Sequence, residues 1–292
     1  KFLNFPIMPF ATSFDGTKIH YQVVGQGNKP IFFIMGLGVD MRGWMFQVQH
    51  FSKKYKVYLI DNRGVGKTDK PSKPFTTEDM AKDIYYVMQK ENVEKANFVG
   101  ASMGGMILQK FAALFPDKVE NLVLACTLAK LTDHEKELIK KGFKFIKGID
   151  VDVNNEEIIK NLLLQTIEAD PEKIFNFLSK NIFDPVFFEQ NKDFIINFFK
   201  DYLKDGFSVS GFMKQVWAIL NHDSTEDLPK ITARTLVITG DADKMVPPEK
   251  SLFIHQKIKN SQLKIIKGGS HAFIFERYEE FNYEIEKFIE SN

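Results

Sequence analysis

The alternation of short apolar runs with longer amphipathic stretches is the feature of this sequence that most constrains its fold. The runs are IFFIM (31–35), KVYLI (56–60), KANFVGA (95–101), ENLVLAC (120–126), RTLVITG (234–240) and LKIIKG (263–268). Between them lie stretches such as residues 76–92, in which Met80, Ile84 and Val87 recur at helical spacing behind a Thr start. Continuous apolar strands separated by helices are typical of a parallel sheet with helices on both faces. The sequence therefore predicts an α/β fold with a mostly parallel, doubly wound sheet.

Two segments depart from this rhythm. Residues 10–24 alternate apolar and polar side chains around Asp15-Gly16, which predicts a hairpin and an antiparallel edge on the sheet. Residues 128–229 have a helical pattern without strand-like runs, after which strands resume. Breaks that contain proline occur at Asp170-Pro171, Asp184-Pro185 and Leu228-Pro229. We predict a helical cap or lid over residues 128–229, inserted into a core formed by residues 1–127 and 230–292.

Charge and composition argue against several classes of partner. Lys and Arg number 39 against 38 Asp and Glu, and this net charge of +1 provides no field to attract nucleic acid or an anionic membrane. The single Cys126 rules out an internal disulfide and is interpreted as a small buried hydrophobe, with a catalytic thiol as the alternative. No apolar run approaches the ~18 residues of a membrane span. The N-terminal KFLNFPIMPF lacks signal-peptide features, so we expect a cytoplasmic protein; the oligomeric state is left open.

The stretch GVGKTD (64–69) resembles the end of a phosphate-binding loop. The full motif GxxxxGK[ST] requires a glycine where this chain has Asp61, and a helix that begins at the lysine. Instead, Pro71 and Pro74 follow closely, which favours a loop. We therefore predict no nucleotide site, and we expect no cofactor and no metal ligands.

A possible nucleophile lies after the third apolar run. Gly100, Ser102 and Gly104 form GxSxG, in which a serine occupies a strained turn between a strand and a helix. Any side chain at either glycine would clash with neighbouring backbone as the turn tightens, and Ser102 would need an unfavourable φ. The strand before this motif and the helix after it make the pattern specific.

A serine nucleophile needs a base, and the base needs an acid that fixes its tautomer. Of the six histidines, only His271 lies in a loop directly after the last predicted strand, in KGGSHAF. The loop after residues 234–240, in ITGDADKMVPPE, offers Asp241 and Asp243. Either carboxylate could instead be a solvated turn residue, so these positions alone leave the acid open.

GASMGG, GDADKMVPP and GGSHAF, in that order, resemble the nucleophile elbow, acid loop and histidine loop of α/β-hydrolase-fold serine hydrolases with a helical cap. The resemblance covers the sheet and leaves the predicted cap unassigned. It implies a triad of Ser102, Asp243 and His271, because the acid of the family's GxxDxxVP pattern aligns with Asp243. DNRGVGKTD in turn resembles the family's DxRGxGxS segment, a sharp turn next to the nucleophile.

Acyl transfer also needs donors where negative charge develops on the carbonyl oxygen. The residue after the nucleophile supplies one backbone N–H, here that of Met103. By its place in MGLG, where similar hydrolases often have HGxG, Leu37 should supply the second; Met35 replaces the usual histidine.

The resemblance implies an esterase- or lactonase-like enzyme that cleaves a small to medium, largely apolar carboxylic ester, lactone or thioester through an acyl-enzyme. An acyltransferase or a cofactor-free haloperoxidase could keep the same triad, and a hydrolase-fold receptor would bind a small molecule with little turnover. Dehalogenases and epoxide hydrolases of this fold carry an Asp nucleophile, which Ser102 argues against. Trp44 and Trp217 are candidates for the substrate pocket, although core or cap packing is the alternative for both.

Overall fold

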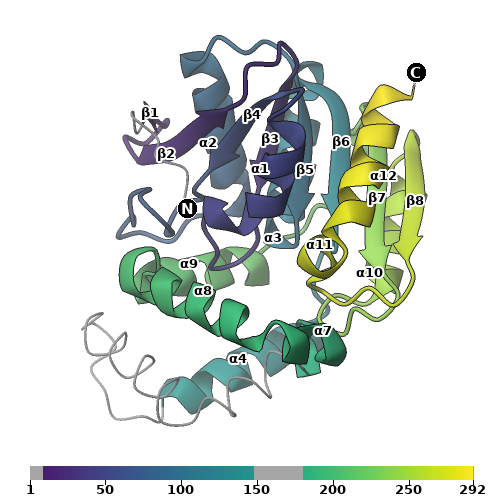
Figure 1. Cartoon of the computed structure of the whole chain (residues 1–292). Helices are drawn as coiled ribbons and strands as arrows, with labels where there is room; N and C mark the ends of the chain where they lie inside the picture. Colours follow the sequence, from purple (N-terminus) through teal and green to yellow (C-terminus); the bar gives the residue numbers. More distant parts are fainter. Residues whose placement is uncertain (1–8, 148–179, 292) are drawn as a thin grey trace.

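The computed structural model describes residues 9–147 and 180–291, and within them a single eight-stranded sheet forms the centre of the molecule (Figure 1). Its strands are β1 (Phe10–Thr12), β2 (Lys18–Val24), β3 (Pro30–Ile34), β4 (Lys56–Ile60), β5 (Ala96–Ala101), β6 (Val119–Ala125), β7 (Arg234–Gly240) and β8 (Ser261–Ile266). They lie in the order β1-β2-β4-β3-β5-β6-β7-β8; β2 runs antiparallel to both of its neighbours, β1 and β4, and all other neighbouring pairs are parallel. The predicted α/β fold with a mostly parallel sheet and an antiparallel edge is confirmed.

The strand boundaries follow the predicted apolar runs to within one residue, except in β8 at the edge of the sheet. β4 and β7 have the predicted bounds, whereas β8 begins at Ser261, two residues before the apolar run. The reason is that β8 forms the edge of the sheet, where Gln262 and Ile265 are exposed to solvent. An edge strand buries little of its surface, so its start carries no apolar signal.

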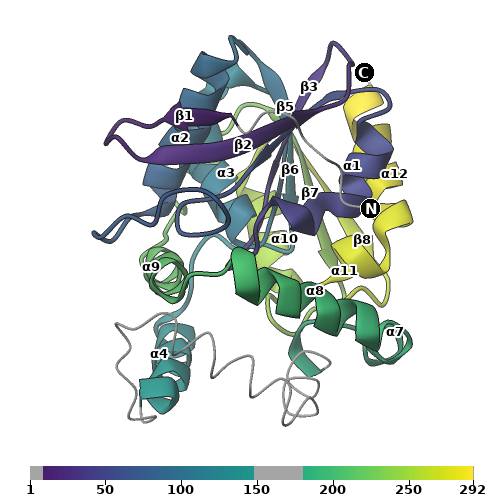
Figure 2. The ribbon, with the colours of Figure 1, turned by 60° about the vertical axis from the view of Figure 1, so that its left-hand side comes forward.

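Helices cover both faces of the sheet (Figures 1 and 2). One face carries α2 (Thr77–Lys90), α3 (Met103–Leu114) and α10 (Pro248–Lys257); the other carries α1 (Met45–Phe51), α11 (Phe273–Glu276) and α12 (Tyr278–Glu290). Short 3-10 helices are η1 (Met41–Trp44), η2 (Pro116–Lys118) and η3 (Leu228–Lys230). Because neighbouring side chains of a strand point to opposite faces, Phe32 of β3 joins the first core and Phe33 joins the second.

Helix α2 illustrates how local sequence sets these elements. Thr76 and Asp79 form a reciprocal capping box that satisfies backbone N–H groups at its start. Met80, Ile84 and Val87 are buried on its inner face, as their spacing predicted.

The segment between β6 and β7, residues 128–229, is called the insertion. Its described helices lie beyond the carboxyl ends of the parallel strands (Figures 1 and 2). They are α4 (Asp133–Lys147), α7 (Pro185–Gln190), α8 (Lys192–Asp205) and α9 (Val209–Leu220). Near its two ends, Lys130 and Asp223 pair as an isolated bridge, with Nζ 3.1 Å from Oδ2. The predicted break at Asp170-Pro171 lies outside the described residues, and the division into core and cap stays a prediction.

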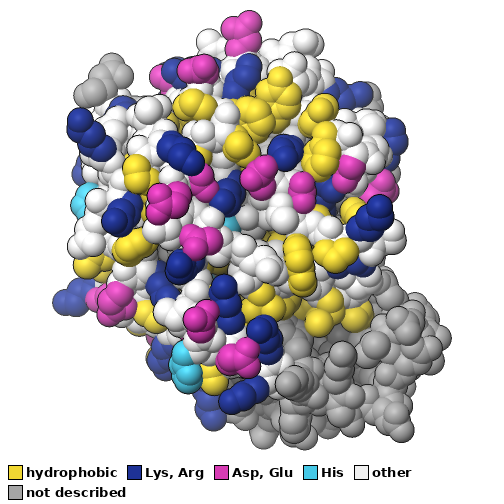
Figure 3. All heavy atoms as spheres, turned by 180° about the vertical axis from the view of Figure 1, so that it is seen from behind, with side chains coloured by type: hydrophobic (Ala, Val, Ile, Leu, Met, Phe, Trp, Pro, Cys, Tyr) yellow, Lys and Arg dark blue, Asp and Glu magenta, His cyan; other side chains and the backbone are white. Residues whose placement is uncertain are grey.

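Charged side chains of both signs are interspersed over the face of the molecule seen in Figure 3. This view therefore contains no field of a single sign that would attract a polyanion. None of the described helices has the length and apolar content needed to cross a bilayer.

Candidate active site

Ser102 lies on the turn between β5 and α3, with an unusual backbone geometry. Its φ of +54° and ψ of −120° fall in a region that residues with a side chain rarely adopt. The turn is held because the Ser102 N–H donates to Ala125 O at 2.9 Å, and Thr127 Oγ1 donates to Ser102 O at 2.7 Å. Strain of this kind costs about 1–3 kcal/mol and persists only where the surroundings enforce it.

The two motif glycines allow this turn to pack tightly. A Cβ on Gly100 would lie 2.6 Å from Gly104 O, and a Cβ on Gly104 would lie 2.0 Å from Ile34 O. Any side chain at these positions would separate the turn from its neighbours. The steric role predicted for both glycines is therefore confirmed.

The structure brings Ser102, His271 and Asp243 together at the carboxyl end of the sheet. His271 Nε2 lies 3.2 Å from Ser102 Oγ, and His271 Nδ1 lies 2.8 Å from Asp243 Oδ2. The two contacts span 169 and 28 residues of sequence, so only the fold can create them. This geometry allows the serine to lose its proton to an imidazole that a carboxylate orients.

The two aspartates of the loop after β7 have different environments. The Asp243 side chain is fully buried, and its Oδ1 accepts the Met245 and Val246 N–H groups at 2.9 and 2.8 Å. Oδ2 is thereby left to face His271. Asp241 is exposed, and its Oδ1 accepts the Gly268 N–H at 2.5 Å. Asp241 thus links the loop after β7 to the loop after β8 by a hydrogen bond, whereas of the two aspartates only Asp243 contacts the imidazole.

Cys126 lies at the end of β6 and is 1 % exposed. Burial raises the pKa of its thiol, and the nearby negative charge of Asp243 raises it further. The thiol is therefore protonated and shielded at neutral pH, which favours the buried-hydrophobe interpretation over a reactive nucleophile.

The loop of residues 35–38, called the oxyanion loop, follows β3 and lies against the serine. A Cβ on Gly36 would be only 3.1 Å from Ser102 Cβ. In the part of the chain that the structure describes, the Leu37 and Met103 N–H groups have no acceptor. Met35, which replaces the family's usual histidine, is buried and packs near Gly43. Met103 directly follows Ser102, and Leu37 directly follows Gly36, which lies against Ser102, so both N–H groups stay candidates for the oxyanion site.

Helix α9 of the insertion packs directly on the oxyanion loop and on the loop after β4 that contains Arg63 and Gly64. The sequence did not reveal this contact. A Cβ on Gly211 would lie 1.9 Å from Gly64 O, so the two glycines set the close approach. The Gln215 side chain accepts the Gly38 N–H with Oε1 at 2.8 Å and donates from Nε2 to Arg63 O at 2.7 Å. The available signal was a glutamine within an otherwise apolar helical face of GFMKQVWAIL.

The insertion also holds the histidine loop. The Ala272 N–H and Ser270 Oγ both donate to Ile182 O, at 2.9 and 2.8 Å. Glu276 Oε1 accepts the Asp184 N–H at 2.5 Å and lies 2.7 Å from Ser270 Oγ, so the single hydroxyl proton of Ser270 is shared between Ile182 O and this carboxyl. Burial raises the pKa of Glu276. The Ala272 backbone and the Ser270 side chain, on either side of His271, are thus both hydrogen-bonded to Ile182.

The two tryptophans that are candidates for the substrate pocket have different surroundings. Trp44 is fully buried and packs against Phe33, with ring centroids 5.1 Å apart, so it belongs to the core rather than to a pocket entrance. An aromatic residue at the start of a helix gives the same sequence pattern in either role. Trp217 is 41 % exposed on α9, four residues after the equally exposed Met213. Neither observation places Trp217 against Ser102.

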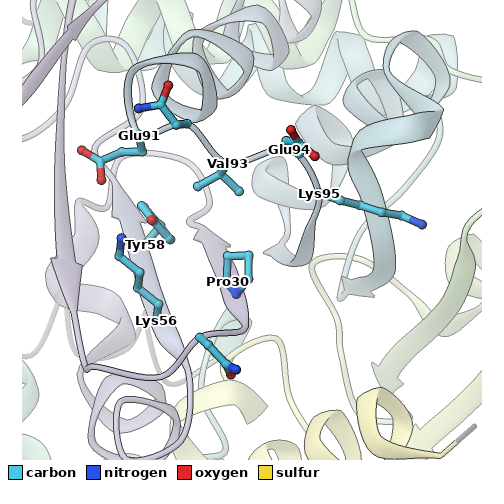
Figure 4. A pocket seen from close by; sticks show the side chains of 9 residues that line it. Pro30, Lys56, Tyr58, Glu91, Val93, Glu94 and Lys95 are labelled. Atoms are coloured by element: carbon cyan, nitrogen blue, oxygen red, sulfur yellow. The ribbon is translucent and has the colours of Figure 1, made fainter.

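A separate hollow of about 440 Å³ lies at the amino ends of the strands, opposite the triad (Figure 4). Its walls include Pro30, Lys56, Tyr58 and Glu91, and it contains none of the predicted site residues. Lys56 Nζ lies 5.4 Å from the centre of the Tyr58 ring. Among the described residues, no group of three or more His, Cys, Asp or Glu side chains could hold a metal ion.

Comparison with known proteins places this arrangement among many relatives. The family model of the α/β hydrolase fold matches residues 29–278. Over 92% of its length the chain is 24% identical to 3-oxoadipate enol-lactonase 2 of Acinetobacter baylyi, covering 91% of that protein. Over 93% of its length it is 26% identical to epoxide hydrolase 1 of Caenorhabditis elegans, covering 68% of that protein. The crystal structure of an enol-lactonase from Burkholderia xenovorans matches 97% of this chain and all of its own, with a TM-score of 0.77 and 24% identity.

Proposed function

The chain belongs to the α/β hydrolase fold family, and on this premise we propose that it is a serine hydrolase acting on ester bonds. The proposed substrate is a small to medium, largely apolar carboxylic ester, lactone or thioester. The observation that carries the proposal is the continuous hydrogen-bonded path from Ser102 Oγ through the His271 ring to Asp243. The enol-lactonase among the relatives is in keeping with an ester or lactone substrate, while the epoxide hydrolase among them shows that relatives also act on other bonds.

In the proposed mechanism, Ser102 Oγ attacks the substrate carbonyl carbon while His271 Nε2 takes its proton. Asp243 stabilises the resulting imidazolium through Nδ1. His271 then gives the proton to the leaving alcohol or thiol, and an acyl-enzyme remains on Ser102. Water, activated by the same imidazole, releases the acid and restores the serine.

The oxyanion of the tetrahedral intermediate is proposed to bind the Leu37 and Met103 N–H groups. Their lack of other acceptors among the described residues supports this role. Met103 also begins α3, so the positive end of a helix dipole faces the developing charge. Such donors act on the transition state more than on the neutral carbonyl.

We also propose that residues 128–229 form a cap over this site, with residues 1–127 and 230–292 as the catalytic core. The hydrogen bonds that Gln215 Oε1 accepts from the Gly38 N–H and that Ile182 O accepts from Ser270 Oγ support this division. The mixture of charges on the face in Figure 3 argues against that face as a binding surface for nucleic acid.

The test is labelling with an active-site-directed fluorophosphonate, followed by intact-mass and peptide analysis. We expect one adduct on Ser102, no adduct in Ser102→Ala, and normal labelling of Ser251→Ala, which changes another buried serine hydroxyl. An adduct on another residue, or equal labelling of Ser102→Ala, would refute the serine-hydrolase proposal.

A panel of esters, lactones and thioesters of graded acyl size then identifies the substrate class. Labelling without turnover on any member would favour a small-molecule receptor. Faster transfer to an added alcohol or to peroxide than to water would favour an acyltransferase or a perhydrolase of the haloperoxidase type.

A further inference from the structure

The oxyanion loop is anchored on both sides of its central peptide groups. On one side, Asn62 Nδ2 donates to Met35 O at 2.8 Å. On the other, the Gly38 N–H donates to Gln215 Oε1 at 2.8 Å. Only the peptide group that carries the Leu37 N–H lies between these anchors. Because peptide groups are planar and rigid, the two anchors restrict the direction in which that N–H points.

The anchors come from different parts of the chain. Asn62 follows β4 in the core, whereas Gln215 is on α9 of the insertion, 177 residues away from Gly38. The Gly38 N–H is occupied by Gln215, so it cannot bind a substrate oxygen at the same time. The Gly38 N–H is therefore excluded as the oxyanion donor, in keeping with the assignment of Leu37.

The surroundings of Gln215 hold its amide in one orientation. The residue is fully buried, and its Nε2 donates to Arg63 O at 2.7 Å, so both amide atoms are used. The Arg63 guanidinium is itself fixed by short ion pairs to Asp83 and Asp15. A flipped amide would place two donors or two acceptors against each other, which the burial of the site makes costly.

We infer that Gln215 is a positioning residue, which transmits the docking of the insertion to the oxyanion loop and so orients the Leu37 N–H for charge stabilisation. The inference rests on the proposed serine-hydrolase function. On this inference, the insertion not only covers the site but also orients one of its catalytic groups. Loss of the Gln215 amide frees the Gly38 end of the loop and misdirects a donor whose effect is greatest in the transition state.

The test is steady-state kinetics of Gln215→Met on an ester that the wild-type protein hydrolyses. This substitution keeps an unbranched side chain but removes both hydrogen bonds. We expect kcat to fall at least about tenfold, with KM within about twofold of wild type and the midpoint of the pH–rate profile unchanged. A purely structural role would instead raise KM and lower Tm without this selective loss of kcat.

The matched control is Asp205→Asn. It weakens another contact between insertion and core, the ion pair of Arg42 Nη2 with Asp205 Oδ1 at 2.9 Å, without touching the oxyanion loop. Its kcat should equal that of wild type. The inference is overturned if Gln215→Met retains kcat within twofold, or if Asp205→Asn loses as much.

Gln215→Glu provides a second test if the Met variant does not fold. When protonated, the new carboxyl offers Gly38 an acceptor and Arg63 O a donor; when ionised, it repels that carbonyl. We expect its kcat to decline with rising pH where wild type shows no decline, and a profile identical to wild type would overturn the inference. A wild-type protein that neither labels nor hydrolyses any ester would refute the proposed function itself, which separates the two failures.

Discussion

Acidification should destabilise this protein through His222, a buried residue at the end of the insertion. Its side chain is 1 % exposed, and Nδ1 lies 2.8 Å from Thr77 Oγ1 of α2, while Nε2 has no partner among the described residues. Burial lowers the pKa of His222 from 6.5 to about 3, and the positive charge of Lys110 adds to this shift. The nearby carboxylates of Asp223 and Asp227 oppose it only in part.

The sign and size of the effect follow from linkage. Between these two pKa values the unfolded chain binds a proton at His222 that the folded protein does not. The free energy of unfolding is therefore unaffected by His222 above pH ~6.5 and falls as the pH drops toward ~3. With these values the loss is about 2 kcal/mol at pH ~5 and approaches about 5 kcal/mol over the whole interval, at 1.36 kcal/mol for each pH unit.

The assay is urea unfolding at pH 7.5 and 5.0, comparing wild type with His222→Asn. The Asn amide can still reach Thr77 but does not titrate. Other groups that titrate in this range, such as Asp83, are common to both proteins and cancel in the difference. We expect wild type to lose about 2 kcal/mol more than the variant over this pH step. Equal losses in the two proteins would show that His222 is not held neutral by its burial.

Two further predictions concern the site and its contact with the insertion. Asp243→Asn should lower kcat on the order of 10⁴-fold with little change in Tm, because the imidazole loses its orienting carboxylate. Asp241→Asn should mainly lower Tm. If Asp241→Asn lowers kcat more than Asp243→Asn does, the acid is misassigned. Gly211→Ala should destabilise the protein by at least about 2 kcal/mol, since its Cβ would lie 1.9 Å from Gly64 O. Met213→Ala, on the exposed side of the same helix, should change the unfolding free energy by less than about 0.5 kcal/mol in the same urea titration.

The parts of the fold that the sequence predicted are those set by local patterns. Apolar runs specify strands because their side chains must leave water on both faces, and the GxSxG glycines are required by contacts within a single turn. The placement of His271 after the last strand was accessible for the same reason, since parallel strands bring their carboxyl ends to one edge. The structure joins these separately predicted loops through the hydrogen bonds to Ser102 and Asp243.

The features that the sequence did not predict depend on distant partners or on burial. Gln215 is one of many polar residues in the insertion, and only the fold reveals that its amide meets Gly38. Trp44 was a candidate for the pocket with core packing as the alternative, because spacing cannot distinguish these two surroundings of an aromatic side chain; the structure places it in the core. The capping role of Asp184 for α7 was signalled only as a break before Pro185.

The bridge between Lys130 and Asp223 bears on how proteins of this architecture can diversify. The insertion leaves from β6 and returns to β7, which are neighbours in the sheet, so its length and sequence can vary without altering the register of the strands. Recombination or grafting at this junction could therefore exchange one insertion for another as a module. If Gln215 positions the oxyanion loop as inferred above, a graft that preserves turnover also needs an acceptor for the Gly38 N–H where Gln215 Oε1 lies here. We therefore expect that some exchanged insertions would give a folded protein with low turnover.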